Sequence, residues 1–592
     1  MSLSLHPGPA RALAPGALLA LAAALLMLAY HAAAGFPSLA DPGGDNDSLL
    51  RLVQVRDLLA GQAWYDPTQY RMGPEGGFAM HWSRLVDLPI AALVLPFGET
   101  AALIAWPTLL YAVALFLIVR AARDLGGAEA VLPAAIIGGL TLHFSSLFRP
   151  GALDHHNLQF VLTLGALVFL LGAHRMKAAA ALAGTCAALM LAVGMETAPY
   201  VAAACTVPTL AFLLSGSSEA RAARDFGLAF AGVTAAVLVA TVAPGSWHSV
   251  QCDALSLPQT LLAVLGGGGL ALVASSAALS ERVARRLAAL AGLAAVVAAV
   301  ALSLFPQCLA GPYADLDPRL RTFWLDGVSE ARSLPDMLAR DPAKALGFYA
   351  TPLVALATLA WAAWRGRAGR AAAMVAAFLG AAVLVSVWQV RGALFATGLA
   401  TVPLAAWVGR VQAGARERPG LAGLLIVLGC WLASFSILWQ AAGVVPGRIA
   451  GRAPAEAAAR PAARCTALSD FRALAALPQG TVLAVSNLGS SILAEMQHRV
   501  LAGPYHRNQA GNLAMLDAMA VPPAEAEAAV RRAEVDYVVS CAGNGETRFL
   551  SRLAPDSLVA RLAAGEIPAW LSPVAESADA PLTVFRVADD GR

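Results

Sequence analysis

Long apolar runs alternate with short polar segments along most of the 592-residue chain. A membrane-spanning helix needs about 20 predominantly apolar residues, and many of these runs reach or approach that length. The pattern predicts about thirteen membrane helices, over 17–34, 101–119, 130–147, 157–173, 178–194, 198–214, 226–243, 258–279, 287–305, 347–364, 371–388, 394–409 and 420–440. The expected fold class is therefore a polytopic α-helical membrane protein.

Basic residues mark every second loop between the predicted helices. These residues are Arg120, Arg123, Arg175, Lys177, Arg221, Arg224, Arg282, Arg285, Arg286, Arg365, Arg367, Arg370, Arg410, Arg416 and Arg418. Because loops rich in Lys and Arg stay in the cytoplasm, these loops and the N-terminus are predicted to be cytoplasmic. An odd number of helices then places the C-terminal region outside. The segment HAAAG at 31–35 is similar to a signal-peptidase site, but the run before it can span, and we expect it to be retained.

The opposite loops are longer, and the chain ends in a different pattern. In the tail, strand-like runs such as TVLAVSNLG and VDYVVSCAG alternate with helix-like runs such as PPAEAEAAVRRAEV. This alternation predicts a small α/β domain on the outer face. The expected division is a membrane domain over 1–440 with outer loops 35–100 and 306–346, a Pro/Ala/Arg-rich linker over 441–464, and an outer domain over 465–592.

Composition narrows the class further. The chain is 58% hydrophobic and only 13% charged, whereas a soluble protein carries about 25% charged residues. A formal net charge of +3 is too small to indicate a nucleic-acid partner. The seven cysteines form no CxxC motif, so a structural zinc site is not expected. Two disulfides can form outside the cell, between Cys252 and Cys308 and between Cys465 and Cys541, with free thiols as the alternative.

Unusual polar residues gather at the outer ends of the predicted helices. Asp45 and Asp47 follow the first helix. Two carboxylates so close in sequence can hold a divalent cation, or Asp47 can cap the helix of SLLRLVQVRDLLAG. The segment FRPGALDHHNLQFVL brings Asp154 and His156 to the start of another helix. Ionisable groups there are either functional or solvated at the interface.

Two further elements lie on the same predicted face. Glu330 belongs to TFWLDGVSEARSLPDML, in a long loop where a glutamate is usually solvated. Arg391 belongs to SVWQVRGALFATG at the outer end of a helix, where it can snorkel or bind a phosphate with two hydrogen bonds. Carboxylates that hold a metal, together with an arginine that binds phosphate, suit the departure of a sugar from a lipid phosphate.

In order and spelling these motifs resemble those of the catalytic subunit of oligosaccharyltransferase, within the GT-C superfamily of polyprenyl-phosphate-dependent glycosyltransferases. NDSLLRLVQVRDLLAG resembles the first outer-loop motif, which implies a catalytic and metal-binding role for Asp47. GALDHHN resembles G-x-x-D-x-[DH], which implies that Asp154 and His156 bind the metal. GVSEA resembles the S-V-S-E motif, which implies that Glu330 engages the acceptor or the metal. WQVRGALFATG is similar to the segment that binds the lipid phosphate, which implies that role for Arg391.

One family motif is missing. The W-W-D-Y-G motif reads the acceptor hydroxyl, but the corresponding segment VLAVSNLGSSILAEMQHRVLAGPYHRN keeps only its glycine, Gly489. The resemblance therefore covers the donor half of the site and not sequon recognition. In GPYHRN, Tyr505 and His506 are predicted substrate contacts, with an ordinary loop as the alternative. Arg149 is a candidate phosphate contact or an interfacial anchor, and Glu196 in VGMETAPY matches no family role.

The resulting hypothesis is a metal-dependent glycosyltransferase that moves a sugar or oligosaccharide from a polyprenyl-(pyro)phosphate carrier to a protein, lipid or polysaccharide acceptor. The expected cofactor is Mg²⁺ or Mn²⁺, because both prefer oxygen ligands. The resemblance implies a bacterial inner-membrane protein with its C-terminal domain in the periplasm. The alternative is a lipid or glycolipid transporter or flippase, for which charges near the bilayer midplane would be expected.

Overall fold

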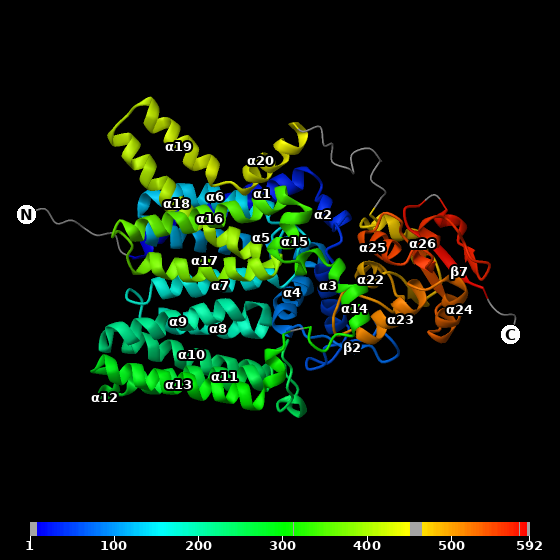
Figure 1. Cartoon of the computed structure of the whole chain (residues 1–592), viewed down its shortest axis with the longest axis horizontal. Helices are drawn as coiled ribbons and strands as arrows, with labels where there is room; N and C mark the ends of the chain where they lie inside the picture. The colour runs from blue at the N-terminus through cyan, green and yellow to red at the C-terminus, as the bar shows by residue number, and fades with distance from the viewer. Residues whose placement is uncertain (1–8, 312, 450–463, 579, 589–592) are drawn as a thin grey trace, which may run out of the picture.

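The computed structural model describes residues 9–311, 313–449, 464–578 and 580–588. A bundle of long helices that run in roughly one direction occupies one part of the molecule, and a mixed α/β unit lies beyond one end of the bundle (Figure 1). The chain enters and leaves that end of the bundle several times before it forms the α/β unit. This end therefore brings together segments that are far apart in sequence.

The bundle helices agree with the predicted spans. They are α1 (Pro9–Ala33), α5 (Glu99–Gly126), α6 (Val131–Phe144), α7 (His156–Leu171), α8 (Ala179–Val193), α9 (Ala198–Ser215), α10 (Ser217–Thr241), α11 (Leu257–Ser275), α12 (Ala277–Ser280), α13 (Val283–Leu304), α16 (Pro342–Trp364), α17 (Arg370–Trp388), α18 (Ala393–Glu417), α19 (Leu421–Ala433) and α20 (Ser436–Ile449). Among the described residues, 9 helices are long and apolar enough to cross a membrane, or up to 10 if a bent pair is one span. Three shorter apolar helices accompany them, and every predicted segment except the last overlaps one of these helices. The polytopic helical class is confirmed.

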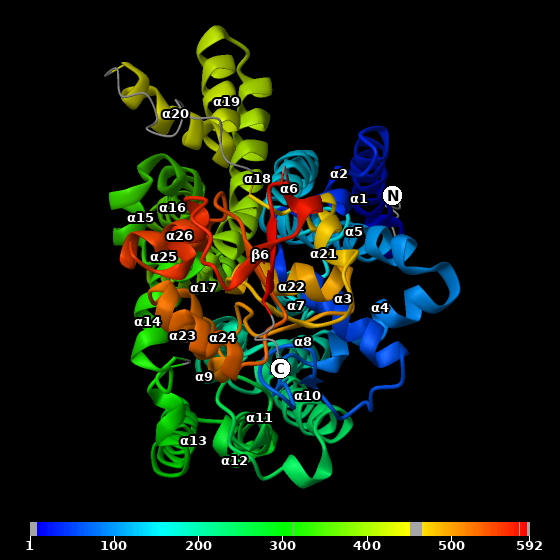
Figure 2. The same ribbon diagram turned by 90° about the vertical axis from the view of Figure 1, so that its right-hand side faces the viewer.

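The last predicted span is bent. The segment 420–440 was expected to be one helix, but α19 and α20 meet at an angle of 88°. Helix α19 extends away from the rest of the bundle in the turned view (Figure 2), whereas α20 packs against α16. The hydroxyl of Ser434 donates to the Cys430 carbonyl at 2.7 Å, at the point where α19 ends. Helix α20 continues to Ile449, into the predicted linker, and the rest of that linker, 450–463, lies outside the described residues.

The two long loops that were predicted to lie outside, 35–100 and 306–346, fold into short elements at the end of the bundle. The first contains α2 (Pro37–Ala40), α3 (Asn46–Leu59), β1 (Thr68–Gln69), β2 (Phe78–Ala79) and α4 (Arg84–Phe97). The second contains α14 (Pro318–Phe323) and α15 (Leu334–Arg340). In Figure 1, α3, α4 and α14 lie between the bundle and the α/β unit.

The C-terminal unit is a small α/β fold, as predicted. Its strands are β3 (Thr481–Leu483), β4 (Arg499–Val500), β5 (Tyr537–Ser540), β6 (Leu571–Pro573) and β7 (Thr583–Val587). Its helices are α21 (Arg472–Ala475), α22 (Ser486–Glu495), α23 (Gln509–Met519), α24 (Pro523–Arg532), α25 (Gly545–Leu553) and α26 (Leu558–Ala563). The sheet order is β4-β3-β5-β7-β6, in which β4, β3 and β5 are parallel and β7 is antiparallel to both of its neighbours.

Helix α3 belongs to both hydrophobic cores of the molecule. Leu52 and Val55 pack into the core of the bundle. Leu50 and Val53, on another face of α3, pack into a second core that joins the α/β unit to the outer loop around Trp324. Because buried apolar contacts fix a helix in place, the position of α3 depends on the bundle and on the α/β unit together.

Both predicted disulfides are present. Cys252 is bonded to Cys308, which links the loop after α10 to the loop after α13. Cys465 is bonded to Cys541 within the C-terminal unit. Disulfides persist in oxidising compartments, so both pairs agree with the predicted outer location of these segments.

Candidate metal centre

Asp154, His155 and His156 form a compact group just before and at the start of α7. One ligand atom from each lies within 4.8 Å of the others. Nδ1 of His156 contacts Oδ2 of Asp154, and Nδ1 of His155 lies 2.8 Å from Oδ1 of the same carboxylate. The two predicted ligands, Asp154 and His156, are therefore brought together, and His155, which had no predicted role, joins them.

The atoms of this group fit a divalent metal ion. Oδ1 of Asp154, Nδ1 of His155 and Nε2 of His156 are buried, and none has a hydrogen-bond partner within the described part of the chain. Nearly all buried polar atoms in proteins have such a partner. The short approach of His155 to Asp154 thus lacks hydrogen-bond geometry. Carboxylate oxygen and imidazole nitrogen are both metal ligands, so a divalent cation is a partner of the kind that these three residues could hold.

Asp45 and Asp47 have different tasks at the start of α3. The carboxylate of Asp45 accepts from the Ser48 amide at 3.1 Å and from the Ser48 hydroxyl at 2.9 Å. Asp45 is therefore the helix cap, and the alternative in which Asp47 caps α3 is wrong. Burial and the neighbouring Asp154 carboxylate raise the pKa of Asp47 to about 7. The negative charge of Asp154 therefore acts on the Asp47 carboxyl, although Asp47 does not belong to the three-residue group.

We predict that Asp45→Ala lowers the stability of the protein, whereas Asp47→Ala weakens its binding of Mn²⁺. Loss of an N-cap costs about 1 kcal/mol, so Asp45→Ala should lower the free energy of unfolding by that amount. Asp47→Ala removes no cap and should leave stability close to that of the wild type, while it weakens Mn²⁺ binding. Denaturant unfolding and Mn²⁺ titration of both variants check this. Equal destabilisation by the two substitutions would contradict the assignment.

Glu196 supplies a second carboxylate behind the histidines. It lies in the short 3-10 helix Met195–Thr197 before α9. Its Oε2 is 3.2 Å from Nε2 of His155 and accepts from Nε2 of Gln159 at 3.1 Å. A carboxylate that holds a ligand imidazole fixes the orientation of the ring. The only sequence signal for this role was a glutamate at the outer end of an apolar run.

Arg391 and Glu330 complete the surroundings. Arg391, in the 3-10 helix Val390–Gly392 before α18, donates from Nη1 to Glu196 at 3.3 Å. Its Nη2 is 3.9 Å from Oε2 of Glu330. Glu330 has 67% of its side chain exposed, and its negative charge contributes to the raised pKa of Asp47. Arg391 and Glu330 therefore lie beside the group of Asp154, His155 and His156 without belonging to it.

The other predicted substrate contacts are engaged within the protein. Arg149 bonds to the Pro42 carbonyl and lies 3.7 Å from Asp45, so it holds the turn before α3. Tyr505 is only 3% exposed, and its hydroxyl donates to the Asn46 carbonyl at 3.0 Å. His506 is 2.7 Å from Asp253. In this geometry, the three side chains support the site rather than present themselves to a ligand.

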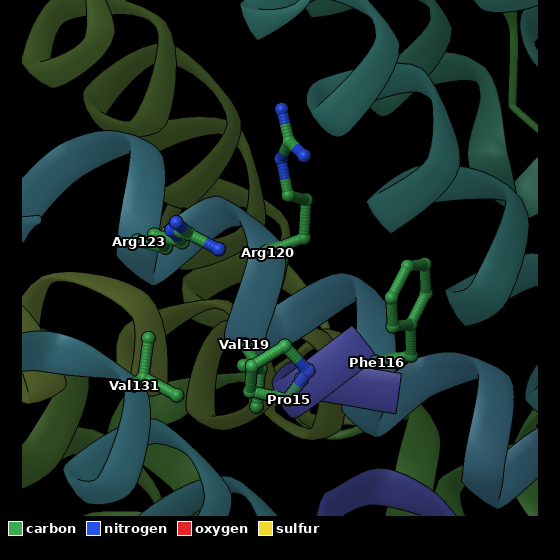
Figure 3. Close-up of a pocket in the computed structure, with 7 residues that line it drawn as sticks. Pro15, Phe116, Val119, Arg120, Arg123 and Val131 are labelled. Carbon is green, nitrogen blue, oxygen red and sulfur yellow. The ribbon is translucent and has the colours of Figure 1, made fainter. Parts of the chain in front are cut away.

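A pocket also occurs near the other end of α5, away from these groups. The pocket is lined by residues of α1, α5 and α6 (Figure 3), namely Pro15, Gly16, Phe116, Val119, Arg120, Arg123 and Val131. Arg120 pairs there with Asp124 at 3.1 Å. No carboxylate or imidazole lines this pocket, so it lacks the groups of the metal centre.

The chain resembles known proteins in its fold but not detectably in its sequence. No family model and no curated protein matches the sequence. Among solved structures, the oligosaccharyltransferase AglB of Archaeoglobus fulgidus, in complex with an inhibitory peptide and a dolichol-phosphate, matches with a TM-score of 0.63 and 14% identity, over 94% of this chain and 72% of that chain. An oligosaccharyltransferase of Archaeoglobus fulgidus in its apo form matches with a TM-score of 0.62 and 14% identity, over 97% of this chain and 74% of that chain. The chain has the fold of an oligosaccharyltransferase.

A third structure of the archaeal oligosaccharyltransferase contains Zn and sulfate, and matches with a TM-score of 0.61 and 15% identity, over 93% of this chain and 70% of that chain. At this level of identity the likeness concerns the fold, and it supports the predicted polytopic helical architecture with a small C-terminal α/β unit. The oligosaccharyltransferase fold thus brings the motifs of four distant segments to one end of the bundle, around Asp154.

Proposed function

We propose that this protein is a metal-dependent glycosyltransferase that transfers a sugar or oligosaccharide from a polyprenyl-(pyro)phosphate carrier to an acceptor. The observation that supports it most is the group of unpartnered buried ligand atoms on Asp154, His155 and His156, in a chain with the oligosaccharyltransferase fold. The structure of the archaeal oligosaccharyltransferase AglB is a complex with a dolichol-phosphate, which supports a lipid-linked donor here.

The proposed metal ligands are Asp47, Asp154 and His156, with His155 beside them and Glu330 at the edge of the site. A bound Mg²⁺ or Mn²⁺ would neutralise the charge that builds on the departing phosphate. Oε2 of Glu196 lies 3.2 Å from Nε2 of His155 and 3.8 Å from Nε2 of His156, and so keeps both rings oriented. The half-buried ion pair between Glu196 and Arg391 holds the guanidinium beside the Asp154–His156 group, where it is placed to bind the lipid phosphate.

The acceptor side of the site involves the loop that carries Glu330. This loop is fixed at both ends, because the Val390 amide donates to the Arg332 carbonyl at 2.9 Å and Gly327 lies against the ring of Phe549 in α25. Glu330 itself stays largely exposed. An exposed carboxylate beside a half-buried arginine can accept a proton or a hydrogen bond from an incoming acceptor nucleophile.

The identity of the acceptor is open in this proposal. At the start of α22, where the family places W-W-D-Y-G, this chain has Val485, Ser486, Asn487 and Leu488 before Gly489. Gly489 packs against the Ala502 carbonyl so tightly that a Cβ would lie 2.1 Å from that oxygen. The backbone of the motif is thus constrained, while its aromatic and acidic side chains are absent. We propose an acceptor other than a standard sequon.

The proposed location is the inner membrane, with the metal centre and the C-terminal domain (465–592) on the periplasmic side of the membrane domain (1–440). The function is tested by mass spectrometry of cell-envelope glycans and glycoproteins from cells that lack the chain and from cells in which it is restored. We expect one glycan to disappear from its acceptor and its lipid-linked precursor to accumulate. A glycan profile unchanged by deletion, or precursor lost from the outer leaflet alone, would favour a transporter instead.

A further inference from the structure

A second cluster of charged groups joins the C-terminal unit to the membrane domain, close to the metal centre. Its central residue is Asp253, in the outer loop between α10 and α11. Arg507 donates to both oxygens of Asp253, from Nε at 2.7 Å and from Nη2 at 2.5 Å, and His506 contacts the same carboxylate at 2.7 Å. Asp253 and His506 are 253 positions apart in sequence.

The arrangement is that of an interdomain anchor rather than of a second metal site. His81, Asp253 and His506 lie close enough to hold an ion. However, Asp253 is the only carboxylate among them, and the guanidinium of Arg507 already occupies both of its oxygens. A paired guanidinium beside the carboxylate neutralises it and repels a cation. The proposal therefore concerns what the Arg507–Asp253 pair holds in place.

The loop that presents Asp253 is rigid. The carbonyl of Gln251 accepts from the Ser256 hydroxyl at 2.7 Å and from Nε2 of Gln259 at 2.9 Å. Cys252, next to Asp253, is bonded to Cys308. The side chain of Gln251 also accepts from Arg507 at 2.9 Å. The membrane domain thus offers a fixed point for the segment 503–508 of the C-terminal unit, which we call the docking loop.

The docking loop contacts the start of α3 directly and reaches the histidine half of the metal centre through Trp82. The hydroxyl of Tyr505 bonds to the Asn46 carbonyl, one residue before Asp47. The ring of Tyr505 lies edge-on to Trp82, with centroids 5.4 Å apart. Trp82 also lies beside the imidazole of His155, again with ring centroids 5.4 Å apart. A displacement of the docking loop would therefore move the start of α3 and remove the packing behind His155.

We propose that Asp253 is a positioning residue for the metal centre: by anchoring Arg507 and His506, it fixes Tyr505 against the start of α3 and against Trp82, and so sets the distance between Asp47 and the Asp154–His156 group. This inference rests on the proposed function for its catalytic consequence, but the geometry of the metal centre can be measured without sugar transfer. Asp253 touches none of the three grouped ligands and acts only through the docking loop.

The test compares Asp253→Asn with a matched control in the full-length protein in detergent. Asp253→Asn keeps the shape of the side chain and removes the charge that holds Arg507. The control is Asp517→Asn, which breaks the exposed ion pair between α23 and Arg319 of α14, at 2.8 Å. Both substitutions remove one contact between the C-terminal unit and an outer loop, but only the first lies in the docking loop's anchor.

Two readouts are used. Mn²⁺ affinity is measured from the electron paramagnetic resonance signal of the free ion, and backbone order is measured by hydrogen exchange over 44–50. We expect Asp253→Asn to weaken Mn²⁺ binding about 10-fold, as loss of a supporting contact commonly does, and to speed exchange over 44–50. Tyr505→Phe should show the same faster exchange with a smaller loss of affinity. Asp517→Asn should behave like the wild type, and all three variants should retain the thermal unfolding midpoint within a few degrees.

The proposal is overturned if Asp253→Asn binds Mn²⁺ and exchanges like the wild type, or if Asp517→Asn has an equal effect. If Asp253→Asn does not fold, Tyr505→Phe decides, because it leaves the Arg507–Asp253 pair intact. A wild-type protein that binds no Mn²⁺ contradicts the proposed metal chemistry, and hydrogen exchange over 44–50 then decides the role of Asp253 alone. Failure of the inference and failure of the proposed function are therefore separate results.

Discussion

Asp154→Ala is expected to reduce sugar transfer by about 10²- to 10³-fold, the loss typical for removal of one preorganised charged group from an active site. Asp154 contacts both histidines of the group, and burial is outweighed by their charges, which hold the pKa of this carboxyl well below its usual range. The carboxylate is thus ionised and ready for a cation. Transfer of a labelled lipid-linked sugar by purified protein, with Mn²⁺ or Mg²⁺ present, measures the effect.

Asp124→Ala is the matched control for Asp154→Ala. Asp124 is also a shielded carboxylate with two basic partners, Arg120 at 3.1 Å and Arg175 at 2.6 Å, but it lies at the other end of α5. We expect Asp124→Ala to transfer sugar like the wild type. A chelator should reduce wild-type transfer as far as Asp154→Ala does, and should have little further effect on that variant. Equal activity of Asp154→Ala and wild type would contradict the proposed ligand.

Asp87→Ala is expected to have the largest effect on stability, a loss of about 3–5 kcal/mol, the cost of breaking a buried ion pair from one side. Asp87, in α4, accepts from Arg51 of α3 at 2.8 Å and from Arg84 at 3.1 Å. Arg51 and Asp87 are 0% and 1% exposed. Without this carboxylate, the guanidinium groups of Arg51 and Arg84 stay buried but lose their negatively charged partner. Unfolding in mixed detergent micelles measures the difference.

Glu99→Gln provides the comparison for Asp87→Ala. Glu99 pairs with Arg56 of α3 at 2.7 Å, but the two side chains are 35% and 40% exposed. An exposed pair contributes about 0–1 kcal/mol, because water and salt screen it. We therefore expect a small change for Glu99→Gln. If Asp87→Ala cost no more than Glu99→Gln, the buried network would not stabilise the position of α3 on α4.

The apolar runs predicted the membrane helices because a helix in lipid must satisfy its own backbone hydrogen bonds. Length and apolarity alone therefore locate each span. The bend between α19 and α20 was not predicted, because it follows from the packing of α20 along α16. Gly443 allows that approach, since a Cβ there would lie 2.8 Å from Cα of Ala343. Nothing in the local pattern of 420–440 indicates such a neighbour.

The choice between Asp45 and Asp47 also needed the tertiary structure. Either residue can cap a helix from its sequence position. The turn before α3 contains Gly43 and Gly44 with φ of +68° and +78°, and this turn directs Asp45 toward Ser48. Asp47 follows two residues later, in the first turn of α3, where burial and the nearby Asp154 carboxylate raise its pKa. The direction of the incoming backbone therefore decided which carboxylate is available.

By itself, the sequence determined the helical membrane fold, the C-terminal α/β unit, the two disulfide pairs and the proximity of Asp154 to His156, because apolar length, periodicity and short-range spacing are local properties. Only the tertiary structure placed His155 and Glu196 at the metal group, buried Tyr505, and brought Arg507 to Asp253. These contacts join residues from separate helices and loops. Their partners are chosen by the packing of α3 between two cores, which no single segment encodes.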